Sequence, residues 1–287
     1  MNNEKFSEGI TLLRQPIMPL VSMVQFLFMT GPFATVAEVV GELPEPIETD
    51  RTTYEHPRSL LSGYLDILAG FEQVKEGTFP LPKVVDEENK PVESFTAGVA
   101  VIHQQLLTAE LEKINSALCG PCGCTLCCVG PDKTMAQEFF EIPLRSGELE
   151  LFAVSRCDNP VSRNSLPEDE EELLWEGRPF YRIAGPALFH WKKGWSLILP
   201  KGSACPNLND KGRCRVYNAR PTVCRRPQLF PYMVEPLAGA EGGAPAMRIR
   251  RTLLAVVDCP YVRELQEEIA DYATAGELHL LLKQNKQ

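Results

Sequence analysis

Apolar residues recur at helical spacing in the first part of the chain. This spacing predicts four helices, because residues three and four positions apart share one face of a helix. They cover Leu20–Thr30, Val36–Gly41, Leu60–Phe71 and Val99–Leu118. Segments in which every second residue is proline, such as 43–47, interrupt the helical pattern, because a residue before proline avoids the helical conformation. We therefore expect residues 1–115 to form a helical N-terminal region.

The second part of the chain has a different pattern, with short apolar runs typical of strands. Strands are predicted over Leu149–Val154, Trp195–Leu199 and Ile249–Val257. The acidic stretch 168–172 predicts the start of a solvated helix, and the small residues 238–245 predict a surface loop.

A last helix is expected to begin at Cys259-Pro260, because proline suits the first turn of a helix. The fold class is α+β with three zones. The helical region 1–115 precedes a small, loop-rich cysteine-cluster domain over 116–260. Residues 261–287 form a C-terminal helix that we expect to pack on this domain.

An uncharged run extends over residues 15–37 and raises the question of a membrane segment. Pro16, Pro19 and Pro32 divide it, leaving a piece of about a dozen residues, which is the length of a buried helix. We favour a core helix, with a membrane segment and a cleaved signal as the alternatives. We expect a cytoplasmic location, because residues 1–14 lack the clearly basic start of a signal peptide.

The net charge of −9 argues against a general nucleic-acid binder, which would need a basic surface. The stretch 201–226 reverses this balance, with seven basic residues and one acid. This basic stretch coincides with several of the cysteines, so it bears on their chemistry.

Ten cysteines are the main chemical feature of the sequence, and five of them lie within residues 119–128. Cysteines this dense bind soft metals, form disulfides or carry out redox chemistry. A reducing cytoplasm disfavours disulfides, and no thioredoxin-like pattern is present, so metal binding is the favoured interpretation. The candidate ligands are Cys119, Cys122, Cys124, Cys127, Cys128, Cys205, Cys214, Cys224 and Cys259.

The spacing within this set is informative. Cys124 and Cys127 form a CxxC knuckle that directs two sulfurs at one ion. The side chains of adjacent residues point in different directions, so Cys127 and Cys128 are not expected to bind the same single ion. The nine candidate ligands therefore suit two four-cysteine sites or one iron cluster with spare thiols. Cys157 is interpreted as a spectator.

Arginines near the second group of cysteines have a matching role. Arg220 and Arg225 are predicted to bind the cofactor by donating hydrogen bonds towards thiolate sulfur. Two alternatives stay open, namely that these arginines are only solvated surface residues or that they bind an anionic ligand. The histidines lie outside the cysteine groups, so thiolate ligation dominates.

The cysteine spacing resembles that of the YkgJ-like cysteine-cluster family of zinc- or iron-chelating domains. The resemblance covers about 119–260, or half of the chain. It rests on Cys124-x2-Cys127-Cys128, Cys205-Pro-Asn-Leu, Gly212, Cys214-Arg-Val-Tyr217, Arg220-Pro221-x2-Cys224-Arg225, Phe230-Pro231 and Cys259. The family's first cysteine falls where this chain has Gly120 and Pro121, so Cys119 or Cys122 takes its role.

The resemblance implies a zinc or iron–sulfur site and, for most members, no established reaction. Some relatives are flagellin lysine methylases, so an iron–sulfur enzyme of electron or group transfer is one alternative. A zinc-stabilised adaptor that binds a protein partner is another. The sequence does not distinguish zinc from iron, because thiolates bind both.

Overall fold

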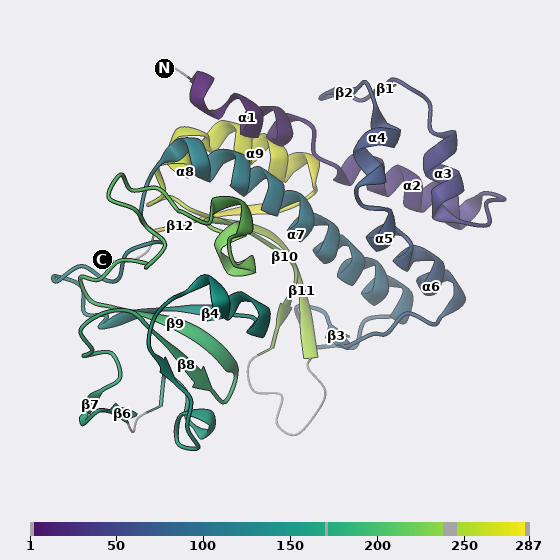
Figure 1. Cartoon of the computed structure of the whole chain (residues 1–287). Helices are drawn as coiled ribbons and strands as arrows, with labels where there is room; N and C mark the ends of the chain where they lie inside the picture. The colour runs from purple at the N-terminus through teal and green to yellow at the C-terminus, as the bar shows by residue number, and fades with distance from the viewer. Residues whose placement is uncertain (1–2, 170–171, 238–245, 285–287) are drawn as a thin grey trace. The chain divides into compact units, whose positions relative to one another are not determined.

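The structure is a computed structural model that describes residues 3–169, 172–237 and 246–284. The chain forms two compact units (Figure 1). The helical unit comprises Met1–Leu118 and Gln228–Asn285, and the inserted unit runs from Cys119 to Pro227. The second unit is therefore an insertion in the chain of the first. Sequence analysis assigned 228–260 to the cysteine domain, whereas the structure groups these residues with the N-terminal helices.

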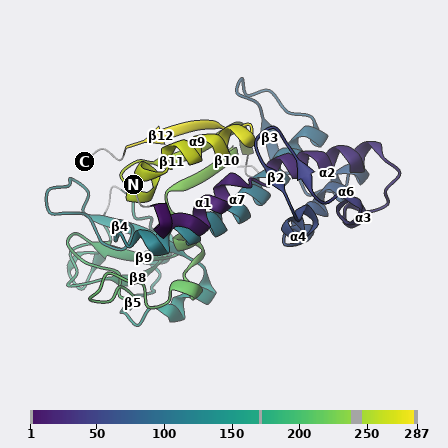
Figure 2. The ribbon, with the colours of Figure 1, turned by 90° about the horizontal axis from the view of Figure 1, so that it is seen from above.

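Short helices and one long helix make up most of the helical unit. They are α1 (Ser7–Arg14), α2 (Met18–Thr30), α3 (Val36–Glu42), α4 (Pro57–Ser62), α5 (Leu65–Leu68), α6 (Gly70–Glu76) and α7 (Ser94–Cys122). A 3-10 turn, Asn3–Phe6, precedes α1, and the strands β1 (Ile47–Glu48) and β2 (Thr53–Tyr54) pair between α3 and α4. In Figures 1 and 2, α1 lies beside the later part of α7, and α6 lies beside its first turns.

A four-stranded sheet completes the helical unit. Its strands are β3 (Lys83–Val85), β10 (Leu229–Pro236), β11 (Ala246–Val256) and β12 (His279–Lys283). β10 is antiparallel to β11, whereas β12 and β3 both run parallel to β11. Parallel strands need a crossover. The helices α8 (Pro260–Glu264) and α9 (Gln266–Ala275) provide it between β11 and β12.

Gln104 of α7 anchors the sheet to this helix. Its side-chain amide donates to the Pro231 carbonyl at 2.9 Å, and its Oε1 accepts from the Met233 and Val234 amides at 2.7 and 3.2 Å. The pairing of β10 with β11 shifts register between Tyr232 and Val234, so the ladder is irregular at this point. Gln104 therefore satisfies backbone groups at an irregularity of the sheet.

Replacing Gln104 with alanine is expected to destabilise the helical unit by about 1–3 kcal/mol, the usual effect of leaving buried hydrogen-bonding groups unsatisfied. Urea unfolding of the two proteins would measure the difference. Gln73→Ala removes an exposed glutamine of α6 and serves as the matched control. Equal stability of Gln104→Ala and the unmodified protein would contradict the anchoring role.

The inserted unit contains a second four-stranded sheet, in the order β4 (Phe139–Leu144), β9 (Gly194–Pro200), β8 (Ala187–Trp191) and β5 (Arg156–Cys157). A small ribbon of β6 (Leu174–Trp175) and β7 (Arg178–Pro179) lies nearby in the chain. Four 3-10 turns connect these strands and the cysteine loops. They are η2 (Ser146–Leu151), η3 (Ser162–Asn164), η4 (Tyr217–Ala219) and η5 (Thr222–Arg225).

Both faces of this sheet are packed. Phe189, Trp191 and Ile198 belong to an aromatic cluster on one face, with Phe180 beside them. Leu188 and Leu197 belong to an aliphatic cluster on the other. Burial on both faces explains why β8 and β9 have nearly continuous apolar sequences rather than strict alternation.

The predicted elements agree only in part with the structure. Helices α2, α3 and α7 and strands β9 and β11 are confirmed, and so is a helix that starts at Pro260. The single helix predicted over 60–71 is divided into α4, α5 and α6, with breaks at Gly63 and Ala69. The strand predicted over 149–154 is wrong, since Ser146–Leu151 form a 3-10 turn.

Two other predictions touch residues outside the described part of the chain. The loop at 238–245 lies there entirely, as do residues 170–171 of the acidic stretch. The described residues of that stretch, 168–169 and 172, are not helical.

The uncharged run forms α2, which buries Leu20, Val21, Val24 and Phe28 in the helical unit. Among the described residues, the stretch Glu4–Thr30 is long and apolar enough to cross a membrane by length and composition alone, and 44% of its most apolar window is buried. A core helix passes the same test, so the stretch is compatible with either role.

Candidate metal centre

The first cysteines of the inserted unit lie where α7 ends. Cys119 and Cys122 occupy its last turn, three residues apart and hence on one side of the helix. Gly123 then adopts a left-handed conformation, with φ of 65°, and its amide donates to the Cys119 carbonyl. The turn brings the sulfurs of Cys122 and Cys124 within 4.8 Å of each other, which allows them to bind one metal ion.

Backbone pairing brings the end of the knuckle to the second group of cysteines. The Cys205 amide donates to the Cys128 carbonyl at 2.7 Å, and Val129 pairs with Ala204 in an antiparallel bridge. Gly130 follows at a close approach, where a Cβ atom would lie 2.1 Å from the Pro200 carbonyl oxygen. Glycine is required there, because any side chain would separate the two segments.

A tight loop then positions Cys214 near Cys205. Leu208 and Cys214 pair in an antiparallel bridge, and the Asn209 side chain accepts from the Lys211 and Arg213 amides. Gly212 supplies the left-handed residue of the turn, with φ of 71°. The turn therefore gives a local structural reason for a glycine at position 212.

Glu148 holds the loop that carries Cys224. Its Oε1 accepts from the Thr222 amide at 2.7 Å and from the Thr222 hydroxyl at 2.8 Å. The Cys224 amide donates to the Pro221 carbonyl, which closes the 3-10 turn η5. Sequence analysis did not single out Glu148. Its only signal is the capping pattern with Arg145, whose amide donates to Glu148 Oε2.

The eight cysteines of the sequence prediction that belong to the inserted unit lie close enough to affect one another's ionisation. Burial raises the pKa of Cys128, and the charges of neighbouring thiols raise it further, namely those of Cys127, Cys205, Cys224 and Cys119. Burial also raises the pKa of Cys224 to about 12, with added contributions from Cys205, Cys127 and Cys214. Cys119 has a raised pKa for the same reasons, with Cys124 and Cys122 as its neighbours.

These shifts have a common physical meaning. Several partly buried thiols cannot all ionise in one place, because each thiolate loses hydration and repels the next. A metal cation reverses this balance and deprotonates the thiols that it binds. The group therefore has the donor chemistry of a soft-metal site, and the identity of the metal is not determined by it.

Arg220 contacts this group directly, and its role in supporting a cofactor stays a prediction. Its guanidinium is buried, lies 3.6 Å from the centre of the Tyr217 ring and hydrogen-bonds the Cys119 thiol. It opposes the burial effect on the pKa of Cys119 and also on that of Cys224. Arg225 lies one turn further on and donates to the Thr222 hydroxyl at 3.3 Å.

Two further cysteines are Cys157 and Cys259. Cys157 is buried in the aromatic cluster of the inserted unit, where its sulfur lies 3.5 Å from the Asn159 side-chain nitrogen, and its interpretation as a spectator stays a prediction. Cys259 belongs to the helical unit, where it is buried and occupies the N-cap position of α8. Its predicted role as a ligand stays a prediction.

The chain matches no protein-family model, no curated protein and no solved structure. The geometry and chemistry of the chain's own residues therefore carry the functional argument.

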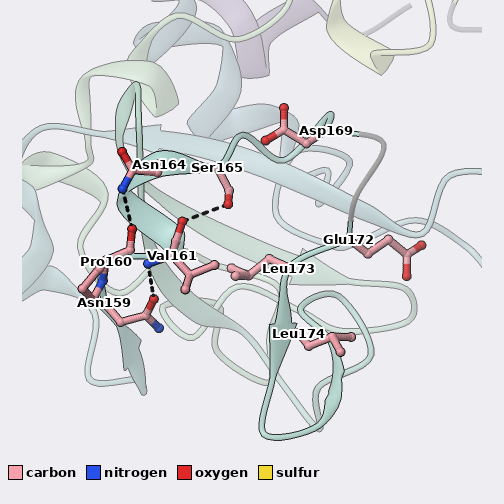
Figure 3. A pocket seen from close by; sticks show the side chains of 9 residues that line it. All are labelled: Asn159, Pro160, Val161, Asn164, Ser165, Asp169, Glu172, Leu173 and Leu174. Carbon is pink, nitrogen blue, oxygen red and sulfur yellow. Dashed lines mark hydrogen bonds between the residues drawn. The ribbon is translucent and has the colours of Figure 1, made fainter.

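The inserted unit also has a surface hollow that is separate in chemistry from the cysteine group. Its described lining residues include no cysteine (Figure 3). Their polar atoms bond within the lining, since Asn159 accepts from the Val161 amide and Asn164 donates to the Pro160 carbonyl. These bonds shape a loop and do not point to a ligand.

Proposed function

We propose that this protein is a cytoplasmic metal-binding protein of the YkgJ-like cysteine-cluster type. Its thiolates would hold zinc or an iron–sulfur cluster. The observation that carries the proposal is that eight cysteines lie in the inserted unit, with the sulfurs of Cys122 and Cys124 within 4.8 Å of each other and several of the thiols raising one another's pKa. Cys259 is the proposed ninth ligand, on the strength of its place in the sequence pattern.

The arrangement within the inserted unit supports more than one metal position. Cys119 has Cys122 and Cys124 as neighbours at the end of α7, and Cys128 has neighbours in both parts of the group. The neighbours of Cys224 in the paired loops are Cys127, Cys205 and Cys214. Two zinc ions would each take four thiolates, and an iron–sulfur cluster would take four with thiols to spare. Zinc would stabilise the fold, whereas a cluster would add electron transfer.

Elemental analysis and a visible spectrum of anaerobically purified protein test this proposal. We expect about two zinc ions per chain, or iron with sulfide and a charge-transfer absorbance near about 400 nm. A colourless zinc protein would support the structural role, and a substrate-dependent change in a cluster spectrum would support the enzyme. Fewer than about 0.5 metal ions per chain with no such absorbance would refute the proposal, because thiolate sites of this kind bind tightly.

A further inference from the structure

A buried carboxylate on α7, nine residues before Cys119, links three segments of the helical unit. Glu110 of α7 is only 4% exposed. Its Oε1 accepts from the Ile17 amide at 2.8 Å, and its Oε2 accepts from the Tyr272 hydroxyl of α9 at 2.6 Å. One side chain thus connects α7 to α9 and to the segment between α1 and α2.

In that segment, side chains hydrogen-bond both the N–H and the carbonyl of one peptide group. α1 ends at Arg14 and α2 begins at Met18, so the Pro16–Ile17 peptide lies between the two helices. The N–H of this peptide, from Ile17, donates to Glu110. Its carbonyl, from Pro16, accepts from the Tyr54 hydroxyl at 2.7 Å. Since both polar groups of the peptide are buried, the two side chains supply the partners that water would otherwise provide.

We propose that Glu110 is a proton-sensitive clasp that controls how firmly residues 3–17 are held in the helical unit. Protonated Glu110 can remain buried at little cost, whereas ionised Glu110 favours an opened state in which water reaches the carboxylate. The clasp therefore loosens as the pH rises.

The groups around Glu110 determine the pH at which this happens. Burial raises the pKa of Glu110 to about 7, and three groups oppose it, namely the Tyr272 hydroxyl, the Ile17 amide and the charge of Lys113. The other ionisable groups facing it are Tyr54 and Tyr64, whose own pKa values are raised by burial and by Glu110.

The sign of the effect follows from linkage. The folded carboxyl keeps its proton up to a pH of about 7, whereas the exposed carboxyl loses it near its ordinary value of 4.5. The contribution of Glu110 to the free energy of unfolding is therefore greatest below pH 4.5 and falls as the pH rises towards 7. Any opening that exposes Glu110 becomes about tenfold more frequent between pH 6 and pH 8.

Hydrogen exchange of the full chain at pH 6 and pH 8, corrected for intrinsic rates, tests the clasp. We expect the opening constant of amides in residues 6–17 to rise about tenfold in the unmodified protein. Glu110→Gln should remove this pH dependence, because the amide does not titrate. Glu267→Gln removes an exposed carboxylate of α9 and should leave the dependence unchanged.

A second variant keeps the test decisive even if Glu110→Gln folds poorly. Tyr272→Phe retains the buried carboxyl and removes a donor that favours its ionised form, so the midpoint of the opening should move to higher pH. Equal opening of the unmodified protein at both pH values would overturn the proposal. An unchanged tenfold rise in Glu110→Gln would overturn it too.

Discussion

Serine in place of both Cys128 and Cys224 is expected to remove most of the bound metal and to unfold the inserted unit. Each of these two thiols has its pKa raised by several neighbouring thiols of the inserted unit. A structural zinc site of four thiolates contributes apparent binding energy on the order of 10–16 kcal/mol. This is as large as the total stability of a typical domain, about 5–15 kcal/mol, so the effect on folding should be large.

Metal content and limited proteolysis would be measured together, with cleavage mapped to residues 119–227. Cys157→Ser is the matched control, because it removes a cysteine of the inserted unit that lies in the aromatic cluster and outside the predicted ligand set. Chelation of the unmodified protein should reproduce the proteolysis pattern of the double variant. Full metal content in the double variant would exclude these thiols as ligands.

Trp191→Ala is expected to destabilise the inserted unit by about 3–5 kcal/mol, the usual effect of truncating a fully buried large aromatic residue. Trp191 is 2% exposed, stacks on Phe189 with ring centres 5.2 Å apart and donates from its indole to the Ser196 hydroxyl at 2.8 Å. The substitution would leave a cavity in the aromatic cluster and remove one of the hydrogen-bond partners of the Ser196 hydroxyl, which also bonds Glu141.

Hydrogen exchange of peptides within β8 and β9 would measure the loss with the metal bound. Trp195→Ala provides the control on the same hairpin, since Trp195 is only partly buried and stacks on the half-exposed ring of His190. We expect its effect to be less than half as large. Equal effects of the two substitutions would indicate that the metal, rather than the packed sheet, holds this hairpin together.

The sequence predicted best where local patterns decide the structure. α7 has apolar positions at helical spacing over many turns, and β9 is a continuous apolar run. The strand predicted over 149–154 failed because alternating leucines fit a strand as well as a turn. The bonds from Glu148 to Arg145 and Thr222 select the turn, and the second of them joins residues 74 positions apart.

The cysteine spacing singled out the residues of the candidate metal centre, and their role as metal ligands stays a prediction. Eight of the nine predicted ligands lie in the inserted unit, and Arg220 lies beside Cys119. The assignment of residues 228–260 to a domain was not predictable, because it depends on pairing with distant segments. β11 pairs with Lys83–Val85 and with His279–Lys283, and no local pattern encodes either partner.

The insertion of one unit into the other fixes the order in which a ribosome delivers them. Residues 119–227 are synthesised before any residue of β10, β11 or β12. The cysteine unit can therefore fold on the nascent chain and take up the proposed metal there, since domains generally fold as units during synthesis. The N-terminal helices must wait for β10, β11 and β12 with part of their apolar surface uncovered, and this is the stage at which the chain most needs a chaperone.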